Sequence, residues 1–168
     1  RHETTPTLGS LIDGGANGGV SGSDVTVLDT SMEAVDITGL ANHSLDNVHL
    51  CTVAGLLQSQ KGPIIGIFHQ YAHHGTGQTV HSINQMRHFG INIDDIPRTF
   101  GGTQMVQTPD GYVIPLSIRN GLAYMDMKAP TQDEMDSYPH VMFTSDMPWD
   151  PQVLDNEVSP SDPDFNPD

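Results

Sequence analysis

The chain of 168 residues has few basic residues and a single cysteine. Lys and Arg number 6 and Asp and Glu number 21, so the formal net charge is −15 at pH 7. Nucleic-acid binding requires clustered Lys and Arg, and an anionic membrane surface would repel this chain, so we expect neither partner. Cys51 alone cannot form an internal disulfide, so the cysteine usage does not indicate an oxidising compartment.

Long apolar runs and aromatic residues are also scarce. No run approaches the roughly 18 apolar residues of a membrane span, and hydrophobic residues make up 36% of the chain and aromatic residues 6%. Gly and Pro are frequent instead, with 17 and 12 residues. This composition favours short strands and turns over long helices, and the length suffices for one domain with a core plus an extension.

Most of the chain reads as short strands. Alternation and β-branched residues predict strands over roughly 9–13, 24–29, 33–40, 47–57 and 63–72. The turn signal Pro109-Asp110-Gly111 predicts a hairpin between residues 105–107 and 112–118, with Pro115 on an edge strand. The dipeptide Asn120-Gly121 predicts a second turn.

One short helix is expected at about residues 79–89. Thr79 would be its N-cap and Gly90 would lie at its C-terminal cap. A weaker helical pattern covers residues 131–138, with Thr131 as the cap. The sequence therefore predicts an all-β domain with little helix.

Composition divides the chain into three segments. Residues 1–9 read as an N-terminal arm, residues 10–128 as the β domain, and residues 129–168 as an acidic extension rich in Pro and Asp. The extension contains ten acids and no Lys or Arg. A tail of this composition is normally disordered unless a neighbouring molecule holds it, which suggests an assembly.

In the segment "LIDGGANGG", residues 11–19, Asp13 lies at the end of a predicted strand, and the residues that follow it are mostly glycine. Such an acid can simply cap a turn. The alternative is a catalytic carboxylate that backbone amides approach closely. Aspartic-protease chemistry needs two carboxylates that share a proton, and a chain with one such turn supplies both only as a two-fold dimer.

"LIDGGANGG" resembles the Asp-Thr/Ser-Gly-Ala motif of retropepsins, in particular the protease of Ty1/copia-type retrotransposon polyproteins. "GQTVHSINQMRHFG" and "VQTPDGYVIPLSIRNGLAYMDM" resemble later segments of those polyproteins in the same order. The amino-acid sequence is most similar to copia-type elements of diatoms and related algae. The resemblance spans roughly residues 8–128. It implies a small closed retropepsin-like β-barrel with one helix, active as a homodimer that cuts its own polyprotein.

Carried over by position, the resemblance makes Asp13 the catalytic residue, with Gly15 and Ala16 matching the motif. Gly14 departs from it, because the family has Thr or Ser there, whose hydroxyl bonds across the dimer. The family's flap is assigned to "DITGLANHS", residues 36–44.

Two functions follow from this reading. The first is an aspartic endopeptidase that acts on polypeptide as a homo-oligomer, without cofactor. The second is a catalytically inactive structural protein that self-assembles into an oligomer or filament through its arm and tail. The first would be intracellular and the second released from the cell, and the start at Arg1 suggests a piece of a longer polyprotein.

Other candidate sites have weaker support. His69, His73, His74 and His81 are the densest histidines, but zinc requires three or four converging ligands, so we expect no metal. Asn42 begins a glycosylation sequon. Trp149 and Phe165 are aromatic residues in polar surroundings, either incidentally exposed or anchors for assembly on a neighbouring subunit.

Overall fold

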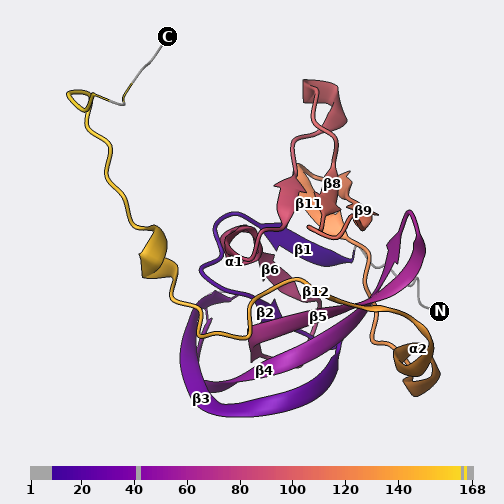
Figure 1. Ribbon diagram of the computed structural model, residues 1–168. Helices are drawn as coiled ribbons and strands as arrows, with labels where there is room; N and C mark the ends of the chain where they lie inside the picture. Colours follow the sequence, from indigo (N-terminus) through magenta and orange to yellow (C-terminus); the bar gives the residue numbers. More distant parts are fainter. Residues whose placement is uncertain (1–8, 41–42, 164, 166–168) are drawn as a thin grey trace, which may run out of the picture.

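The computed structural model describes residues 9–40, 43–163 and 165, and strands dominate it (Figure 1). The predicted arm lies almost entirely outside the described residues. Within them, the larger sheet follows the order β10 (Ser117–Arg119), β11 (Leu122–Met125), β1 (Ser10–Asp13), β6 (Val80–Ser82), β2 (Val20–Ser21), β5 (Gly62–His73), β4 (His43–Ser59) and β3 (Thr26–Leu40), and β12 (His140–Met142) also pairs with β5.

A second, smaller sheet has the order β7 (Asn92–Asp94), β8 (Met105–Gln107) and β9 (Val113–Pro115). The predicted hairpin around Pro109-Asp110-Gly111 is therefore confirmed, and Pro115 lies on an edge strand as expected. Its second strand ends at Pro115, because Ser117–Arg119 pairs with β11 in the larger sheet. The turn at Asn120-Gly121 joins β10 to β11, and both of its residues have positive φ.

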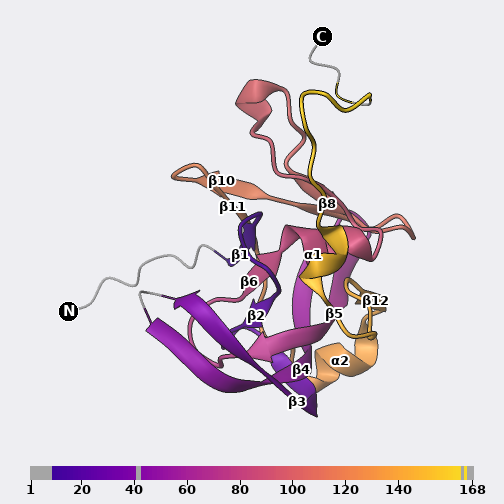
Figure 2. The same ribbon diagram turned by 90° about the vertical axis from the view of Figure 1, so that its left-hand side faces the viewer.

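The predicted break between residues 24–29 and 33–40 is wrong. Both segments belong to β3, which forms one long curved hairpin with β4 along the lower side of the molecule (Figures 1 and 2). The pairing with β4 shifts register between Thr30 and Ala34. A bulge therefore absorbs the residues that interrupt the alternation, and no turn forms.

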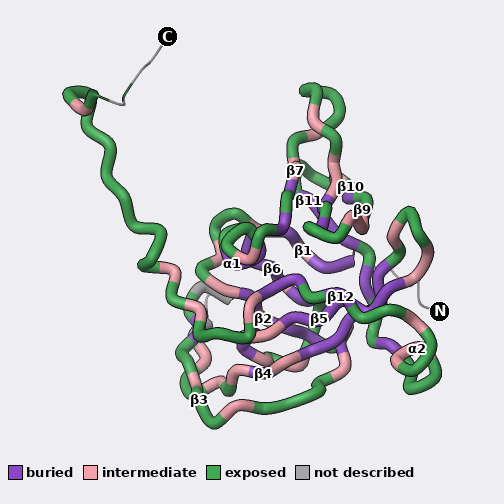
Figure 3. The backbone as a smooth tube through the Cα atoms, in the orientation of Figure 1, coloured by how far each residue is buried: buried purple, intermediate pink, exposed green. Residues whose placement is uncertain are grey.

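The all-β character is confirmed, but the closed barrel is not. The larger sheet runs as an open path, and among the described strands β10 and β3 stand at its two ends. Buried residues lie along the central strands, whereas β3 is mostly exposed (Figure 3). The main apolar cluster joins both sheets and includes Phe68, Met86, Val106, Met125 and Phe143.

The structure corrects the start of the first helix. Helix α1 (Ile83–His88) begins after Ser82, whose Oγ accepts the N–H of Gln85, and not after Thr79. Thr79 instead donates its backbone N–H and its hydroxyl to Asp24. Residues 80–82 form β6, which pairs in parallel with β1, so sheet pairing removes the first predicted turn from the helix.

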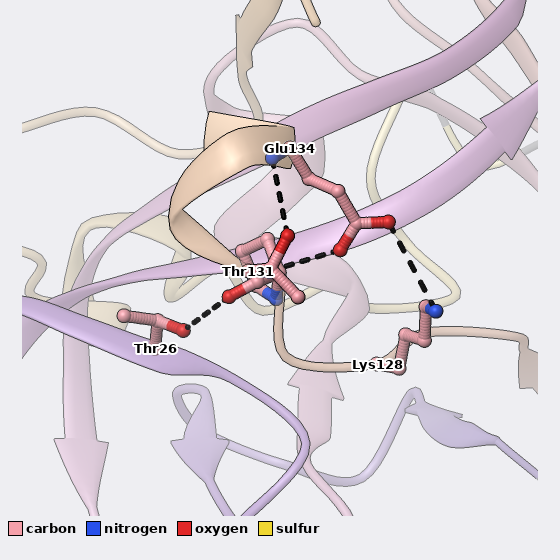
Figure 4. A network of polar contacts seen from close by, with 5 residues as sticks. Thr26, Lys128, Thr131 and Glu134 are labelled. Atoms are coloured by element: carbon pink, nitrogen blue, oxygen red, sulfur yellow. Dashed lines mark hydrogen bonds and ion pairs between the residues drawn. The ribbon is translucent and has the colours of Figure 1, made fainter. Parts of the chain in front are cut away.

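The second predicted helix is confirmed as α2 (Gln132–Ser137). Figure 4 shows its capping box, in which Thr131 Oγ1 accepts the N–H of Glu134 at 3.2 Å and Glu134 Oε1 accepts the N–H of Thr131 at 2.9 Å. Thr26 on β3 donates to Pro130 O at 3.2 Å, which fixes this corner to the sheet. In the part of the chain that the structure describes, neither α1 nor α2 is long enough to cross a membrane.

Part of the acidic extension is built into the core. Its strand β12 pairs in parallel with β5, and Val141 and Phe143 are buried. The Thr144 hydroxyl donates to His69 O at 2.8 Å and accepts the N–H of His69 at 2.7 Å. After the short 3₁₀ helix η2 (Pro151–Leu154), the described tail runs away from the body of the molecule (Figure 1).

A chain of buried hydrogen bonds crosses the centre of the larger sheet. The Tyr71 hydroxyl bonds His81 Nδ1 at 2.7 Å, His81 Nε2 bonds Ser10 Oγ at 3.0 Å, and Ser10 donates to Met125 O at 2.7 Å. Because Ser10 donates its hydroxyl proton to that carbonyl, its oxygen can only accept from His81. The His81 ring must therefore donate from Nε2 and accept at Nδ1. Burial lowers the pKa of His81 to about 3, so the ring is neutral.

This chain predicts a pH dependence of folding. The unfolded protein binds a proton on His81 below its ordinary pKa of 6.5, whereas the folded protein does so only near pH 3, so stability falls as the pH drops through that range. His73, whose pKa burial also lowers, acts in the same direction. We expect His81→Gln to be less stable at pH 7 but to lose less stability between about pH 6.5 and pH 5, above the range in which most carboxylates titrate.

Denaturant unfolding at a series of pH values measures this slope. His140→Gln supplies the comparison, because it removes an exposed histidine and leaves the buried chain of hydrogen bonds intact. An unchanged slope in His81→Gln would contradict the role assigned to this ring.

Candidate active site

Asp13 is the last residue of β1, in the middle of the larger sheet. Strand β1 pairs antiparallel with β11 and parallel with β6, where Asp13 lies opposite Ser82. The half-buried carboxylate accepts the N–H of Gly15 through Oδ1 at 2.8 Å. The glycine turn therefore brings a backbone amide to the carboxylate and fixes its orientation.

The far end of the glycine loop is held by Gln85 of α1. Gln85 Oε1 accepts the N–H of Gly19 at 2.7 Å, and its Nε2 donates to His69 O and Gln70 O at 3.3 and 3.1 Å. The side chain is 3% exposed, so these bonds form in the interior. Sequence reasoning missed Gln85, because its partners are distant in the chain.

The glycines of the loop differ in the space around them. A Cβ on Gly19 would lie 2.3 Å from the Tyr71 ring, and one on Gly15 would lie 3.3 Å from Asp13 Oδ1. A Cβ on Gly14 would meet Ile83 Cδ1 at 3.7 Å, which is an ordinary contact. Position 14 therefore has room for the hydroxyl-bearing residue of the retropepsin motif, whereas position 19 requires glycine.

The loop borders a cavity of about 520 Å³. Asp13 and loop residues 15–19 line one side, and residues 35–38 of β3 line another. Residues 36–38 belong to the segment expected as the flap, and they include Asp36, which sequence reasoning did not single out as a site residue. None of the described residues that line the cavity is Lys, Arg or His.

Trp149 lies over the glycine loop of its own chain. Its indole N–H donates to Asn17 O at 2.6 Å, a Cβ on Gly18 would lie 3.4 Å from the indole, and the ring lies 5.4 Å from that of His88. Phe165 lies in the tail, 43% exposed. The role of both residues as anchors on a neighbouring subunit stays a prediction, and Asn42 lies outside the described residues.

The four candidate histidines bond hydroxyl groups at separate places. His69 bonds Thr52, His73 bonds Ser21 and His74 bonds Thr76, while His81 belongs to the buried chain described above. In the described parts of the chain, no group of three or more His, Cys, Asp or Glu converges as metal ligands would. The structure thus does not bring these histidines together.

Searches against protein-family models, curated proteins and solved structures find no match to this chain. The resemblance to retropepsins therefore rests on the motif at Asp13 and on the order of the segments that follow it in the sequence. In the structure Asp13 Oδ1 accepts the N–H of the residue two positions on, as a turn-capping Asp does, and the carboxylate also lines the cavity.

The glycine geometry predicts unequal effects of two small substitutions on stability. We expect the free energy of unfolding of Gly14→Ser to stay within about 0.5 kcal/mol of wild type, because its Cβ meets no close atom. Gly19→Ala should lose at least about 2 kcal/mol, because its methyl group would overlap the buried Tyr71 ring. Denaturant unfolding of both variants is the measurement, and equal destabilisation would contradict the described loop path.

Proposed function

We propose that the chain is one half of an aspartic endopeptidase, in which Asp13 and its symmetry mate in a homodimer form the catalytic dyad. The observation that carries the proposal is the position of Asp13. Its carboxylate is oriented by the Gly15 N–H at the end of a central strand, and it lines a cavity that β3 borders on another side.

The chemistry requires a second carboxylate close to the first. One carboxylate takes a proton from water, and the resulting hydroxide attacks the carbonyl carbon of the peptide bond. The other carboxyl group gives its proton to the carbonyl oxygen, and the amine leaves with a proton when the tetrahedral intermediate collapses. A two-fold axis beside the loop would supply both groups from identical chains.

The composition of the cavity supports a polypeptide substrate. Its apolar lining residues come from several strands and include Val20, Val35, Leu50, Ala72 and Val80. Strand β3 stands at the end of the sheet path, so among the described residues one of its edges has no strand partner, and an extended peptide can pair with such an edge. The lack of basic lining residues disfavours phosphorylated or other anionic ligands.

Gly14 bears on the strength of the dimer. The hydroxyl that the family places at this position is missing, so we expect dimerisation to be weaker than in a protein with the full motif. The space around Gly14 means that the hydroxyl can be restored, and Gly14→Ser is expected to raise both the dimer fraction and the specific activity.

The catalytic role of Asp13 is tested by Asp13→Asn. The variant keeps the size of the side chain but cannot share a proton, so we expect cleavage of a peptide mixture at acidic pH to fall on the order of a thousandfold or more. A pepstatin-like compound should block the wild-type activity.

The matched control is Asp46→Asn, which changes an exposed acid on β4 that does not line the cavity. It should cleave like wild type. Equal cleavage by Asp13→Asn and wild type would end the protease proposal.

The tail favours a second candidate function, the self-assembling structural protein. Val153, Leu154 and Val158 are 60%, 44% and 63% exposed, so apolar side chains lie on a segment that runs away from the body. Under this alternative, deletion of residues 150–168 abolishes assembly in sedimentation experiments, and unchanged assembly would count against it.

A further inference from the structure

The C-terminal strap, defined here as residues 143–151, is fixed to the domain at its first residues and contacts it again through Trp149. Phe143 is fully buried and stacks on Phe68 with ring centroids 5.1 Å apart, and the following residue, Thr144, bonds His69 through its hydroxyl. At the other end, Asp150 accepts the N–H of Gln152 at 3.0 Å and caps η2. The strap therefore has a defined path beside the Asp13 loop.

Trp149 is the point at which the strap contacts the loop. The bond from its indole N–H to Asn17 O is 2.6 Å long, and a Cβ on Gly18 would lie 3.4 Å from the ring, so the ring lies close to the loop backbone. The ring is half-buried, and both Trp149 and Pro151 line the cavity that contains Asp13. The hydrogen bond fixes the polar edge of the indole and leaves apolar ring surface available to a ligand.

The other cavity walls define which ligand fits against that ring. Apolar side chains of β2, β3, β4, β5 and β6 line it, and Asp13 and Asp36 add negative charge without a compensating base. An uncharged or basic peptide with a large apolar side chain suits these walls better than any anionic ligand.

We propose that the strap is a permanent wall of the substrate groove and that Trp149 is a specificity-determining residue, which selects peptides with a large apolar side chain beside the bond presented to Asp13. This inference rests on the proposed function, because it names the substrate class of the same site. It assigns to the acidic extension a role in recognition that needs no neighbouring subunit.

The alternative is that the strap obstructs dimerisation, and this alternative makes a different prediction. Two Asp13 loops must approach each other across a two-fold axis, and Trp149 covers Asn17, four residues after Asp13 in the same loop. If the strap obstructs that approach, its displacement should increase dimerisation and cleavage. If it is a wall of the groove, its loss should weaken peptide selection without increasing either.

The experiment uses the full chain and a peptide with a reduced, uncleavable bond, made with either Phe or Ala at the position beside that bond. Calorimetric titration should give at least about tenfold tighter binding of the Phe peptide to wild type. Trp149→Ala should bind both peptides alike, and Trp149→Phe, which keeps an aromatic wall but loses the indole N–H, should restore most of the preference. The control Val153→Ala, at an exposed position beyond the strap, should behave as wild type.

Trp149 is the one tryptophan of the chain, so its fluorescence reports directly on the site. We expect the Phe peptide to shift the emission of wild type to shorter wavelength as the ring becomes more buried. Equal preference in wild type and Trp149→Ala, no binding of either peptide, or a higher dimer fraction and faster cleavage in Trp149→Ala would each overturn the inference. Peptide selection by Trp149 without cleavage by wild type would reject the proposed catalysis and keep the recognition site.

Discussion

The side chain of Tyr71 sets the geometry on which the candidate site depends. Its ring fills the space that a Cβ on Gly19 would occupy, which fixes the end of the glycine loop against β5. Its hydroxyl bonds His81, which bonds Ser10 at the start of β1. One buried residue therefore positions both the strand that leads to Asp13 and the loop that leads away from it. Because this chain of polar groups is fully buried, loss of any one hydrogen bond would leave a buried polar group without a partner. The network therefore favours this single arrangement of the strands.

Local signals predicted the elements whose structure is decided by neighbouring residues. The turn at Pro109-Asp110-Gly111 and the capping box of Thr131 formed as the sequence indicated, because their bonds join residues a few positions apart. The start of α1 was mispredicted, since Thr79 and Ser82 are both good N-caps. The helix starts after Ser82 because Asp24 binds Thr79 and because β6 pairs in parallel with β1. Neither contact leaves a local pattern in the sequence.

The same distinction applies to the site. Asp13 could be proposed because a strand, an acid and a glycine turn are adjacent in the chain. Gln85 and Trp149 could not be assigned their contacts with the loop, because 66 residues separate Gln85 from Gly19 and 132 separate Trp149 from Asn17. The sequence also could not show that Gly14 and Gly19 differ, since the difference lies in what surrounds them. The departure from the motif at Gly14 removes a hydroxyl without any steric need for glycine, so fold and activity can be considered separately at this position.

Charge connects the proposed dimer to the buried core. Two copies that each have a formal charge of −15 repel each other at neutral pH, and protonation of carboxylates at lower pH reduces that repulsion and also supplies the proton that a dyad shares. The same acidification acts against the fold, because burial lowers the pKa of His81 and of His73 and the unfolded chain takes up those protons first. Acid is therefore expected to favour association of the two copies, whereas it lowers the stability of each folded chain. The conditions that suit the proposed dyad are therefore bounded on the acidic side by the protonation of His81 and His73, and His81 is one of the buried residues that position β1.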